Sequence, residues 1–235
     1  MKTLSENLPN ILVVESDAEV RQSLRWKLHA NSYRIEEARS GTEALKRMET
    51  MPPDAVILSL QLPDLDGMDF IRQMRLQEQA LPVIAVSAST DDSHKLHAFD
   101  AGADDFLVKP FLTEELLARL KVALRRSLPL PGTTDRVFRS SHLEVDFSSR
   151  QVRIAGKAVH LTPTEYNLLR LLIRHSNRVL SHHCLLREIW GSKGKYNNQY
   201  LRVFVRQLRI KLESDPRCPR FLHNEPGIGY RFRIG

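Results

Sequence analysis

The segment from Asp54 to Asp64 contains a short apolar run that is expected to be buried and that is followed by one hydroxyl side chain. Ala55–Leu58 is apolar throughout, which is typical of a strand covered on both faces, and Ser59 follows it directly. In an alternating strand–helix domain, ligands and chemistry gather at the carboxyl ends of the central strands. The residue at position 59 therefore indicates which chemistry the first half supports, and a serine hydroxyl is a weak nucleophile unless a base lies beside it.

A second set of candidate residues lies on a predicted helix from about Asn198 to Glu213. Its apolar residues recur at helical spacing and are expected to face a core. The opposite face is rich in arginine, which grips phosphate groups and reads guanine edges. We predict that this face binds DNA; the alternative is a solvated basic face. The predicted face comprises Tyr200, Arg202, Val203, Arg206, Gln207 and Arg209.

Composition and charge bound the class of protein. The chain has 235 residues, of which 42% are hydrophobic and 27% charged, as in soluble globular domains. It has no run of about 20 apolar residues, which a membrane helix needs, so we expect no membrane-spanning segment. It has only two cysteines, so we expect a cytoplasmic protein that is not held together by disulfides. Residues 1–126 carry 16 basic and 20 acidic residues, and residues 127–235 carry 19 and 8, giving net charges of −4 and +11. This asymmetry predicts that the second half binds a polyanion.

The elements that must position Ser59 alternate regularly along the first half. Short aliphatic runs, expected as strands, are separated by segments with apolar residues at helical spacing. Five such repeats over residues 8–126 predict an α/β domain, a doubly wound (βα)5 unit with a five-stranded parallel sheet and helices on both faces. The strands are expected at 10–15, 33–38, 55–58, 82–87 and 105–108, and the last helix from about Glu114 to Arg126.

The second half begins after a proline- and glycine-containing segment, residues 127–137, which is predicted to be a linker. Short alternating segments then indicate a small antiparallel sheet. Thr162-Pro163-Thr164-Glu165 begins a core helix, because it combines a capping Thr, a Pro at the first helical position and a Glu three residues after the cap. A second helix from about Ser181, the arginine-bearing third helix and a hairpin around Pro226-Gly227 complete a winged helix-turn-helix domain over residues 138–235.

Four motifs in the first half resemble the receiver domain of bacterial response regulators. They are Ile11-Leu12-Val13-Val14-Glu15, Leu62-Pro63-Asp64-Leu65-Asp66-Gly67, Pro82-Val83-Ile84-Ala85-Val86-Ser87-Ala88 and Ala101-Gly102-Ala103-Asp104-Asp105-Phe106-Leu107-Val108-Lys109-Pro110-Phe111. In that family an acidic pair ends the first strand and a phospho-accepting Asp ends the third. A Ser or Thr on the fourth strand and a Lys on the fifth complete the site. The resemblance implies Glu15 and Ser16 for the acidic pair, Ser59 for the acceptor, Ser87 for the hydroxyl and Lys109 for the lysine.

Serine therefore stands at two positions where the family has carboxylates, Ser16 and Ser59. Aspartyl phosphorylation needs an ionised carboxylate nucleophile and Mg²⁺, which prefers anionic oxygen ligands. With Glu15 as the one matched carboxylate beside Lys109, we expect weak or absent Mg²⁺ binding and no other cofactor. We predict a pseudo-receiver, meaning a receiver that has lost aspartyl phosphorylation. Two alternatives stay open: Asp17 replaces the missing metal ligand, or a separate kinase phosphorylates Ser59.

The OmpR/PhoB class of response regulators forms a symmetric dimer through paired charges on the face made by the fourth helix, fifth strand and fifth helix. Each such charge alone is typical of a solvated surface pair worth ~0–1 kcal/mol. Three complementary pairs at family positions predict a C₂ homodimer through the receiver. The matching pairs are Lys95 with Glu115, Asp105 with Arg119, and Asp104 with Arg126.

The second half resembles the effector domain of the same class, in Leu161–Leu169, Tyr200-Leu201-Arg202 and Gly227–Phe232. Within the class the chain is similar to regulators of potassium-uptake operons. The resemblance implies that the third helix enters the major groove. Gln207 stands where PhoB-like members have arginine, so a preference for adenine is expected. Tyr200, Arg202, Val203, Arg206 and Gln207 would lie near bases, and Arg209, Trp190, Asn224 and Tyr230 near phosphates.

Two other polar groups are weaker candidates. Asp64 and Asp66 lie in a glycine-containing turn and are predicted to be turn acids. His182-His183-Cys184 has no second Cys/His group at ligand spacing, so no metal site is expected.

Together these features predict a DNA-binding transcriptional regulator that is not an enzyme. Its expected partners are double-stranded promoter DNA, a second copy of the chain and RNA polymerase, with a sensor kinase that docks without phosphotransfer. Two alternatives remain: a phosphorylation-competent regulator with an unorthodox acceptor, and a protein-interaction module whose DNA binding is secondary. Binding to promoter DNA with and without acetyl phosphate separates the three.

Overall fold

The computed structural model describes residues 8–77, 80–127, 137–191 and 196–234, without the side chains of 125–127. The chain forms two compact units, Met1–Leu124 and Arg125–Gly235. Within the described ranges, no helix is long and apolar enough to span a membrane.

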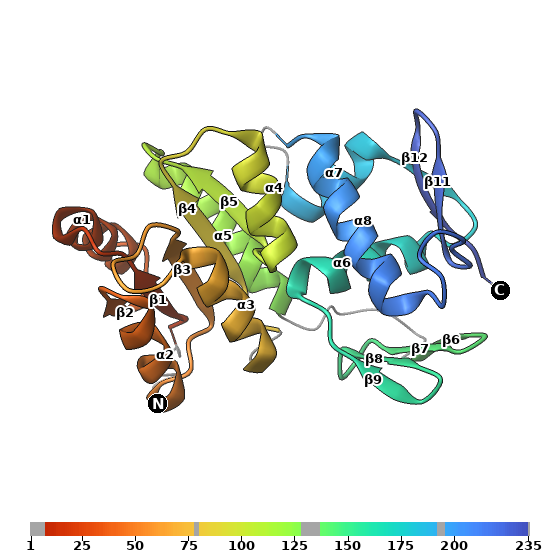
Figure 1. Cartoon of the computed structure of the whole chain (residues 1–235), viewed down its shortest axis with the longest axis horizontal. Helices are drawn as coiled ribbons and strands as arrows, with labels where there is room; N and C mark the ends of the chain where they lie inside the picture. The colour runs from red at the N-terminus through yellow and green to blue at the C-terminus, as the bar shows by residue number, and fades with distance from the viewer. Residues whose placement is uncertain (1–7, 78–79, 128–136, 192–195, 235) are drawn as a thin grey trace, which may run out of the picture. The chain divides into compact units, whose positions relative to one another are not determined.

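A parallel five-stranded sheet in the order β2-β1-β3-β4-β5 forms the centre of the first unit (Figure 1). The inner strands β1, β3 and β4 are buried at every position, because helices cover both faces of the sheet. Ser59 pairs with Val86 and Ser87 with Val108, so the carboxyl ends of these strands share one edge. The strands are β1 Asn10–Val14, β2 Arg34–Ala38, β3 Ala55–Ser59, β4 Val83–Ser87 and β5 Asp105–Val108.

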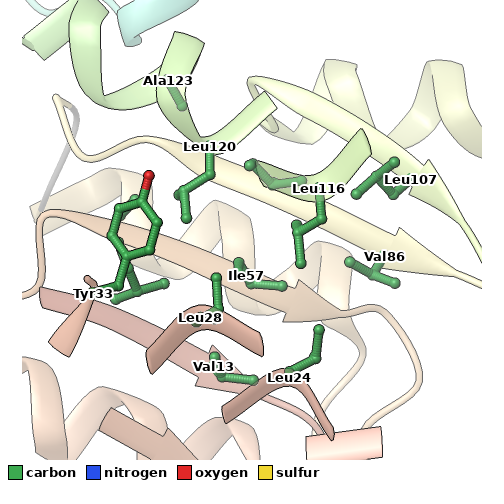
Figure 2. Packing of buried hydrophobic residues seen from close by; sticks show 13 residues of the cluster. Val13, Leu24, Leu28, Tyr33, Ile57, Val86, Leu107, Leu116, Leu120 and Ala123 are labelled. Carbon is green, nitrogen blue, oxygen red and sulfur yellow. The ribbon is translucent and has the colours of Figure 1, made fainter. Parts of the chain in front are cut away.

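Five helices cover the sheet. Leu24 and Leu28 of α1 and Leu116 and Leu120 of α5 pack on one face of it, around Ile57 (Figure 2). Each such side chain, when fully buried, contributes roughly 1.5–3 kcal/mol. The helices are α1 Ala18–His29, α2 Gly41–Thr50, α3 Gly67–Gln77, α4 Asp92–Ala101 and α5 Thr113–Ser127.

The second unit combines two small antiparallel sheets with three helices. One sheet has the order β6-β7-β8-β9 and the other the order β10-β12-β11. Phe204, Phe221 and Phe232 are among its largest fully buried side chains. The strands are β6 Val137–Ser140, β7 Leu143–Asp146, β8 Gln151–Ile154, β9 Lys157–Val159, β10 Val179–Ser181, β11 Leu222–Glu225 and β12 Gly229–Phe232, and the helices are α6 Pro163–Arg174, α7 His182–Trp190 and α8 Asn198–Leu212.

The predicted fold class is confirmed in both halves, including the capping box of Thr162 and Glu165 at the start of α6. The element boundaries differ in places. The linker prediction of 127–137 is too long, because α5 continues to Ser127 and β6 begins at Val137; residues 128–136 lie outside the described ranges. No local pattern indicated β6 and β10, because each is short and exists through pairing with β7 and β12.

Candidate functional site

Four strand ends bring Glu15, Ser59, Ser87 and Lys109 to one edge of the parallel sheet. The ammonium nitrogen of Lys109 lies 2.6 Å from Oε2 of Glu15 and 3.5 Å from Oγ of Ser59. Glu15, Ser59 and Ser87 are 4%, 2% and 0% exposed. Ser87 Oγ accepts a hydrogen bond of 3.1 Å from the N–H of Ser89. Glu15, Ser59, Ser87 and Lys109, four of the five residues matched by resemblance, therefore share this edge in a largely buried pocket that contains an ion pair.

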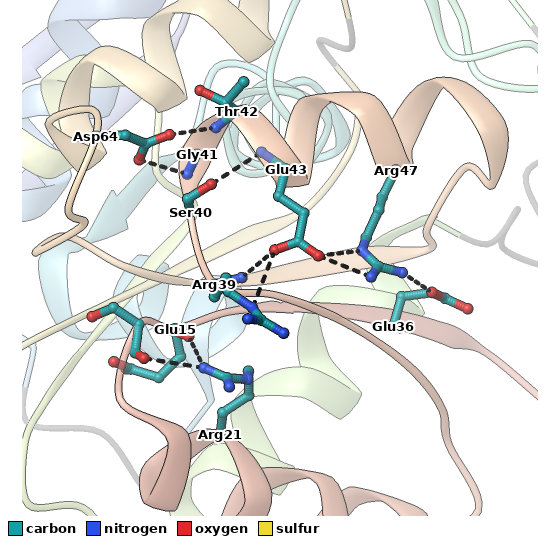
Figure 3. Close-up of polar contacts among 11 residues, drawn as sticks. Glu15, Arg21, Glu36, Arg39, Ser40, Gly41, Thr42, Glu43, Arg47 and Asp64 are labelled. Carbon is teal, nitrogen blue, oxygen red and sulfur yellow. Dashed lines mark hydrogen bonds and ion pairs between the residues drawn. The ribbon is translucent and has the colours of Figure 1, made fainter.

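The loop after β1 places Ser16 and Asp17 differently. Ser16 is exposed, and its carbonyl accepts a hydrogen bond of 3.1 Å from Arg21 Nη1. The carbonyl of Glu15 accepts from the same nitrogen at 2.7 Å (Figure 3). Asp17 caps α1 by accepting from the N–H groups of Glu19 and Val20. Its own N–H donates to Oε1 of Glu15 at 3.1 Å. Oδ1 of Asp17 thus serves the helix terminus, and the role of Asp17 as a metal ligand stays an alternative.

This pocket neutralises its own charge. Oε1 of Glu15 is bonded to a backbone N–H and Oε2 to an ammonium group. The Lys109 ammonium lies 3.5 Å from Ser59 Oγ. An ammonium group donates hydrogen bonds and is not a base, so this contact does not activate the serine. In the part of the chain that the structure describes, no group of three or more His, Cys, Asp or Glu residues is placed to hold a metal ion.

The helix α8 presents a basic face opposite its core face. Arg202 and Arg206 are exposed, and Val203, Gln207 and Arg209 are partly buried. Arg202 and Arg206 are therefore exposed to solvent, as the predicted contact of this face with DNA requires. The core face consists of Leu201, Phe204, Val205, Leu208 and Leu212.

Three of the predicted DNA contacts are instead core residues of the second unit. Trp190, Tyr200 and Tyr230 are 3%, 6% and 5% exposed. The Trp190 ring stacks on Tyr196 at a centroid distance of 5.3 Å and an interplanar angle of 28°, and packs against Phe204. Burial raises the pKa of Tyr230. All three rings are thus largely buried in the second unit, and the contacts predicted for Trp190 and Tyr230 with phosphates and for Tyr200 with bases stay predictions.

The two remaining predicted contacts lie close to the hairpin. Asn224 is exposed on β11. Arg209 donates from Nε and Nη2 to the carbonyl of Leu222, at 3.1 and 2.7 Å. Leu222 is the first residue of β11, so Arg209 connects α8 to the wing.

Both units match known families. Residues 11–121 match the response regulator receiver domain, and residues 156–232 match the family of transcriptional regulatory protein C termini. The chain is 42% identical over 227 residues to the KDP operon transcriptional regulatory protein KdpE of Escherichia coli, covering 97% of this chain and 100% of that protein. The chain belongs to the OmpR/PhoB class of response regulators.

Solved structures agree with this assignment. A mutant of the protein RitR superposes with a TM-score of 0.78 at 25% identity, covering 97% of this chain and 100% of that one. DrrB of Thermotoga maritima, an OmpR/PhoB homolog, superposes with a TM-score of 0.52 at 27% identity, covering 96% and 99%. Response regulators of this class are DNA-binding transcription factors and not enzymes, as predicted.

In this response regulator, several charges predicted for a dimer face are paired within one chain. Arg119 binds Asp105 at 2.7 Å and Glu115 at 2.6 Å, and Asp105 and Arg119 are 3% and 9% exposed. Lys95 binds Asp92 at 2.9 Å. The predicted pair of Asp105 and Arg119 therefore exists within the chain, and the dimer itself stays a prediction.

Asp104 has a buried partner that sequence reasoning missed. Its carboxylate accepts from Arg75 Nη2 at 2.7 Å and from the N–H of Val83 at 3.0 Å. Arg75 also donates to the carbonyls of Gly102 and Leu81. An arginine within the inward apolar pattern of α3, next to Met74, is the signal that could have indicated this role. The predicted pairing of Asp104 with Arg126 has to coexist with Arg75; the Arg126 side chain lies outside the described residues.

The weaker candidates have structural roles. Asp64 accepts from the N–H groups of Gly41 and Thr42, both at 2.9 Å (Figure 3), and these bonds hold its pKa well below the usual range. Asp66 accepts from the N–H of Met68 at 2.8 Å. The two turn acids therefore cap α2 and α3. The His182 ring packs edge-to-face on Tyr230.

Proposed function

We propose that this regulator binds promoter DNA without aspartyl phosphorylation. The observation that supports the proposal is the partly buried contact of Lys109 with Glu15, 2.6 Å from Nζ to Oε2, beside a serine at the acceptor position. In a phosphorylating receiver, the lysine and the carboxylates surround a phosphoryl group and Mg²⁺. Here the lysine already has an anionic partner, and Ser59 supplies a neutral hydroxyl.

The same pocket has little affinity for Mg²⁺ in this proposal. Mg²⁺ gives up its water reluctantly and is held by carboxylates and phosphate oxygens. Glu15 has donors on both oxygens, and Ser16 offers at most a neutral oxygen at the pocket's edge. The regulator therefore works without a metal cofactor.

DNA binding in this proposal uses the exposed side of α8 and the wing. Arg202 and Arg206 are exposed, Gln207 favours adenine, and Asn224 extends the contact from β11. The functional form is a homodimer through the α4–β5–α5 face that recruits RNA polymerase in the cytoplasm. Since a relative is named a regulator of the KDP operon, a potassium-uptake operon is the first target to examine. A sensor kinase docks on the receiver without transferring a phosphoryl group.

The test compares the unaltered protein with the double variant Ser16→Asp/Ser59→Asp, which restores both missing carboxylates. Each protein is incubated with acetyl phosphate and Mg²⁺ and its intact mass is measured. Each is then footprinted on a duplex that the unaltered protein enriches from a random-sequence pool. We expect no phosphoryl adduct and an unchanged footprint for the unaltered protein. An adduct on the double variant shows that the assay detects transfer, and Ser59→Ala is the matched control.

The outcomes separate the alternatives. A phosphoryl adduct on the unaltered protein that tightens DNA binding overturns the proposal and indicates an unorthodox acceptor. Failure to enrich any duplex with either protein indicates an interaction module instead. Removal of Mg²⁺ with a chelator is expected to leave the footprint of the unaltered protein as it was.

A further inference from the structure

The C-terminal end of α8 is anchored to α6, to β11 and to the loop that leads into β11. Its charged side chains Arg209, Lys211 and Glu213 bind different partners: Arg209 the carbonyl of Leu222, Lys211 the carboxylate of Glu165, and Glu213 the chain that leads into the wing. These residues lie past Arg202 and Arg206, the exposed arginines of the same helix. The C-terminal end of α8 is therefore fixed to the rest of the domain, while the exposed face of the helix carries Arg202 and Arg206.

Glu213 and Arg209 together bind both backbone polar groups of Leu222, the first residue of β11. Oε1 of Glu213 accepts from the N–H groups of Phe221 and Leu222, both at 2.9 Å, and Oε2 accepts from the N–H of Arg220 at 2.8 Å. Arg209 donates twice to the Leu222 carbonyl, at 3.1 and 2.7 Å. Glu213 is 7% exposed, and bonds to a buried charged group are stronger than neutral ones. The root of the wing is thus fixed by two side chains of α8.

A second contact fixes α8 on its other side. Lys211 Nζ lies 2.6 Å from Oε2 of Glu165, and Glu165 is 4% exposed. The same oxygen accepts from the N–H of Thr162 at 2.8 Å within the capping box of α6. Lys211 therefore connects α8 to the N-terminus of the first helix of the domain, independently of the wing.

We propose that Arg209 and Glu213 are positioning residues for DNA binding, which hold the wing at one distance and angle from α8. Asn224 lies two residues beyond Leu222 on β11, so the position of Leu222 determines where the wing meets the duplex. A preformed arrangement lets the face with Arg206 and the wing contact one DNA molecule without ordering either element on binding. Arg209 then acts through the wing, and not as the phosphate contact that the sequence suggested. This inference rests on the proposed DNA binding by α8 and the wing.

The direction in which the DNA affinity changes on substitution of Glu213 tests this role. Removing a negative charge from a DNA-binding domain strengthens its general attraction for the polyanion. Because Gln has one acceptor oxygen in place of two, Glu213→Gln weakens the wing attachment, and we expect affinity to fall several-fold. Asp215→Asn is the matched control, because Asp215 is exposed in the following loop and its substitution removes the same charge. We expect its affinity to be unchanged or slightly higher.

Arg209→Ala distinguishes positioning from direct phosphate contact. Affinity is measured on the duplex enriched by the unaltered protein, at several salt concentrations, together with hydroxyl-radical footprints. We expect affinity to fall about tenfold, the effect of losing charge-assisted hydrogen bonds. The protection by the wing is expected to disappear while the protection by α8 remains. Arg209→Lys, which keeps one donor for the Leu222 carbonyl, is expected to restore part of the wing protection.

Two results would overturn the proposal. One is an Arg209→Ala variant that keeps the whole footprint and loses about one unit of salt slope, as expected for one lost phosphate contact. The other is a folded Glu213→Gln variant that binds as well as Asp215→Asn. Thermal unfolding of each variant shows whether it is folded. If Glu213→Gln does not fold, the footprint of the Arg209→Ala variant alone tests the proposal. Failure of the unaltered protein to enrich any duplex overturns the proposed function itself, and is therefore distinct from both results.

Discussion

The two units of this chain differ in their balance of charge, although both contain buried carboxylates with basic partners. In the receiver, buried carboxylates are matched by basic side chains of the same unit: Glu15 by Lys109, Asp104 by Arg75, and Asp105 by Arg119. In the winged-helix unit, α8 leaves Arg202 and Arg206 exposed, and this half of the chain has the excess of basic residues. Charge that is compensated inside the fold fixes geometry, whereas a net excess of charge at the surface attracts a polyanion.

The helix α3 contains a buried and an exposed case of the same pairing. Arg75 is 8% exposed and pairs with Asp104, whereas Arg72 pairs with Asp69 in an exposed contact in which both side chains are more than half exposed. Both are arginines that bind a carboxylate. Their substitution therefore compares a buried pair, together with the carbonyl contacts of Arg75, with an exposed pair.

The largest expected effect is that of Arg75→Ala on the stability of the receiver. It removes the Arg75 guanidinium from the buried Asp104 carboxylate and from the carbonyls of Gly102 and Leu81, which is expected to cost about 3–5 kcal/mol of unfolding free energy. Arg72→Ala is expected to cost about 0–1 kcal/mol. Urea unfolding of both variants measures the difference. Equal losses of unfolding free energy would show that a buried ion pair of this unit contributes no more to stability than an exposed one.

The second prediction addresses the exposed charge of the other unit. Arg206→Ala is expected to weaken binding to the enriched duplex by about 1–3 kcal/mol and to leave thermal unfolding of the protein unchanged. Arg139→Ala is the matched control, because Arg139 is an exposed arginine on β6 that pairs with Glu144. Its affinity is expected to stay close to that of the unaltered protein. A similar loss of affinity for both variants would indicate that DNA binding depends on general electrostatic attraction and not on the exposed face of α8.

Local signals in the sequence predicted most of the fold. The buried runs around Ile57, the capping box at Thr162 and the periodicity of Leu201 to Leu212 each depend on near neighbours in the chain, and the structure has all of them. Short-range patterns therefore placed the elements. The grouping of Glu15, Ser59, Ser87 and Lys109 was implied by the resemblance to receiver domains and not by local patterns.

What the sequence did not indicate depends on contacts between distant residues. The pairing of Arg75 with Asp104 crosses 29 positions, and β10 exists through pairing with β12. The aromatic rings of Trp190 and Tyr230 combine an apolar body with a polar group that suits an interface as well as a core, so residue type did not decide between these locations. The same holds for Arg209, whose guanidinium suits a phosphate as well as the carbonyl of Leu222.

The smallest expected effect concerns an exposed charge that is compensated by backbone N–H groups. Asp64 accepts from Thr42 and Gly41 at the start of α2, which holds its pKa below the usual range. A carboxyl with a lowered pKa in the folded state stabilises the protein above its unfolded pKa of about 3.9, and loses this contribution as the pH falls through the folded value. Asp64→Asn is therefore expected to cost about 1 kcal/mol near neutral pH, typical of a helix cap at an exposed site.

The pH profile decides whether the cap acts through its charge. The difference in unfolding free energy between the unaltered protein and Asp64→Asn is expected to be constant down to about pH 4 and to shrink below it. Glu49→Gln is the control, because this exposed acid lies near the C-terminus of α2, where a negative charge opposes the helix dipole and its removal is not destabilising. A difference for Asp64→Asn that persists unchanged to low pH would show that the shape of the cap matters and not its charge. Asp64 would then not belong with the compensated charges of the receiver.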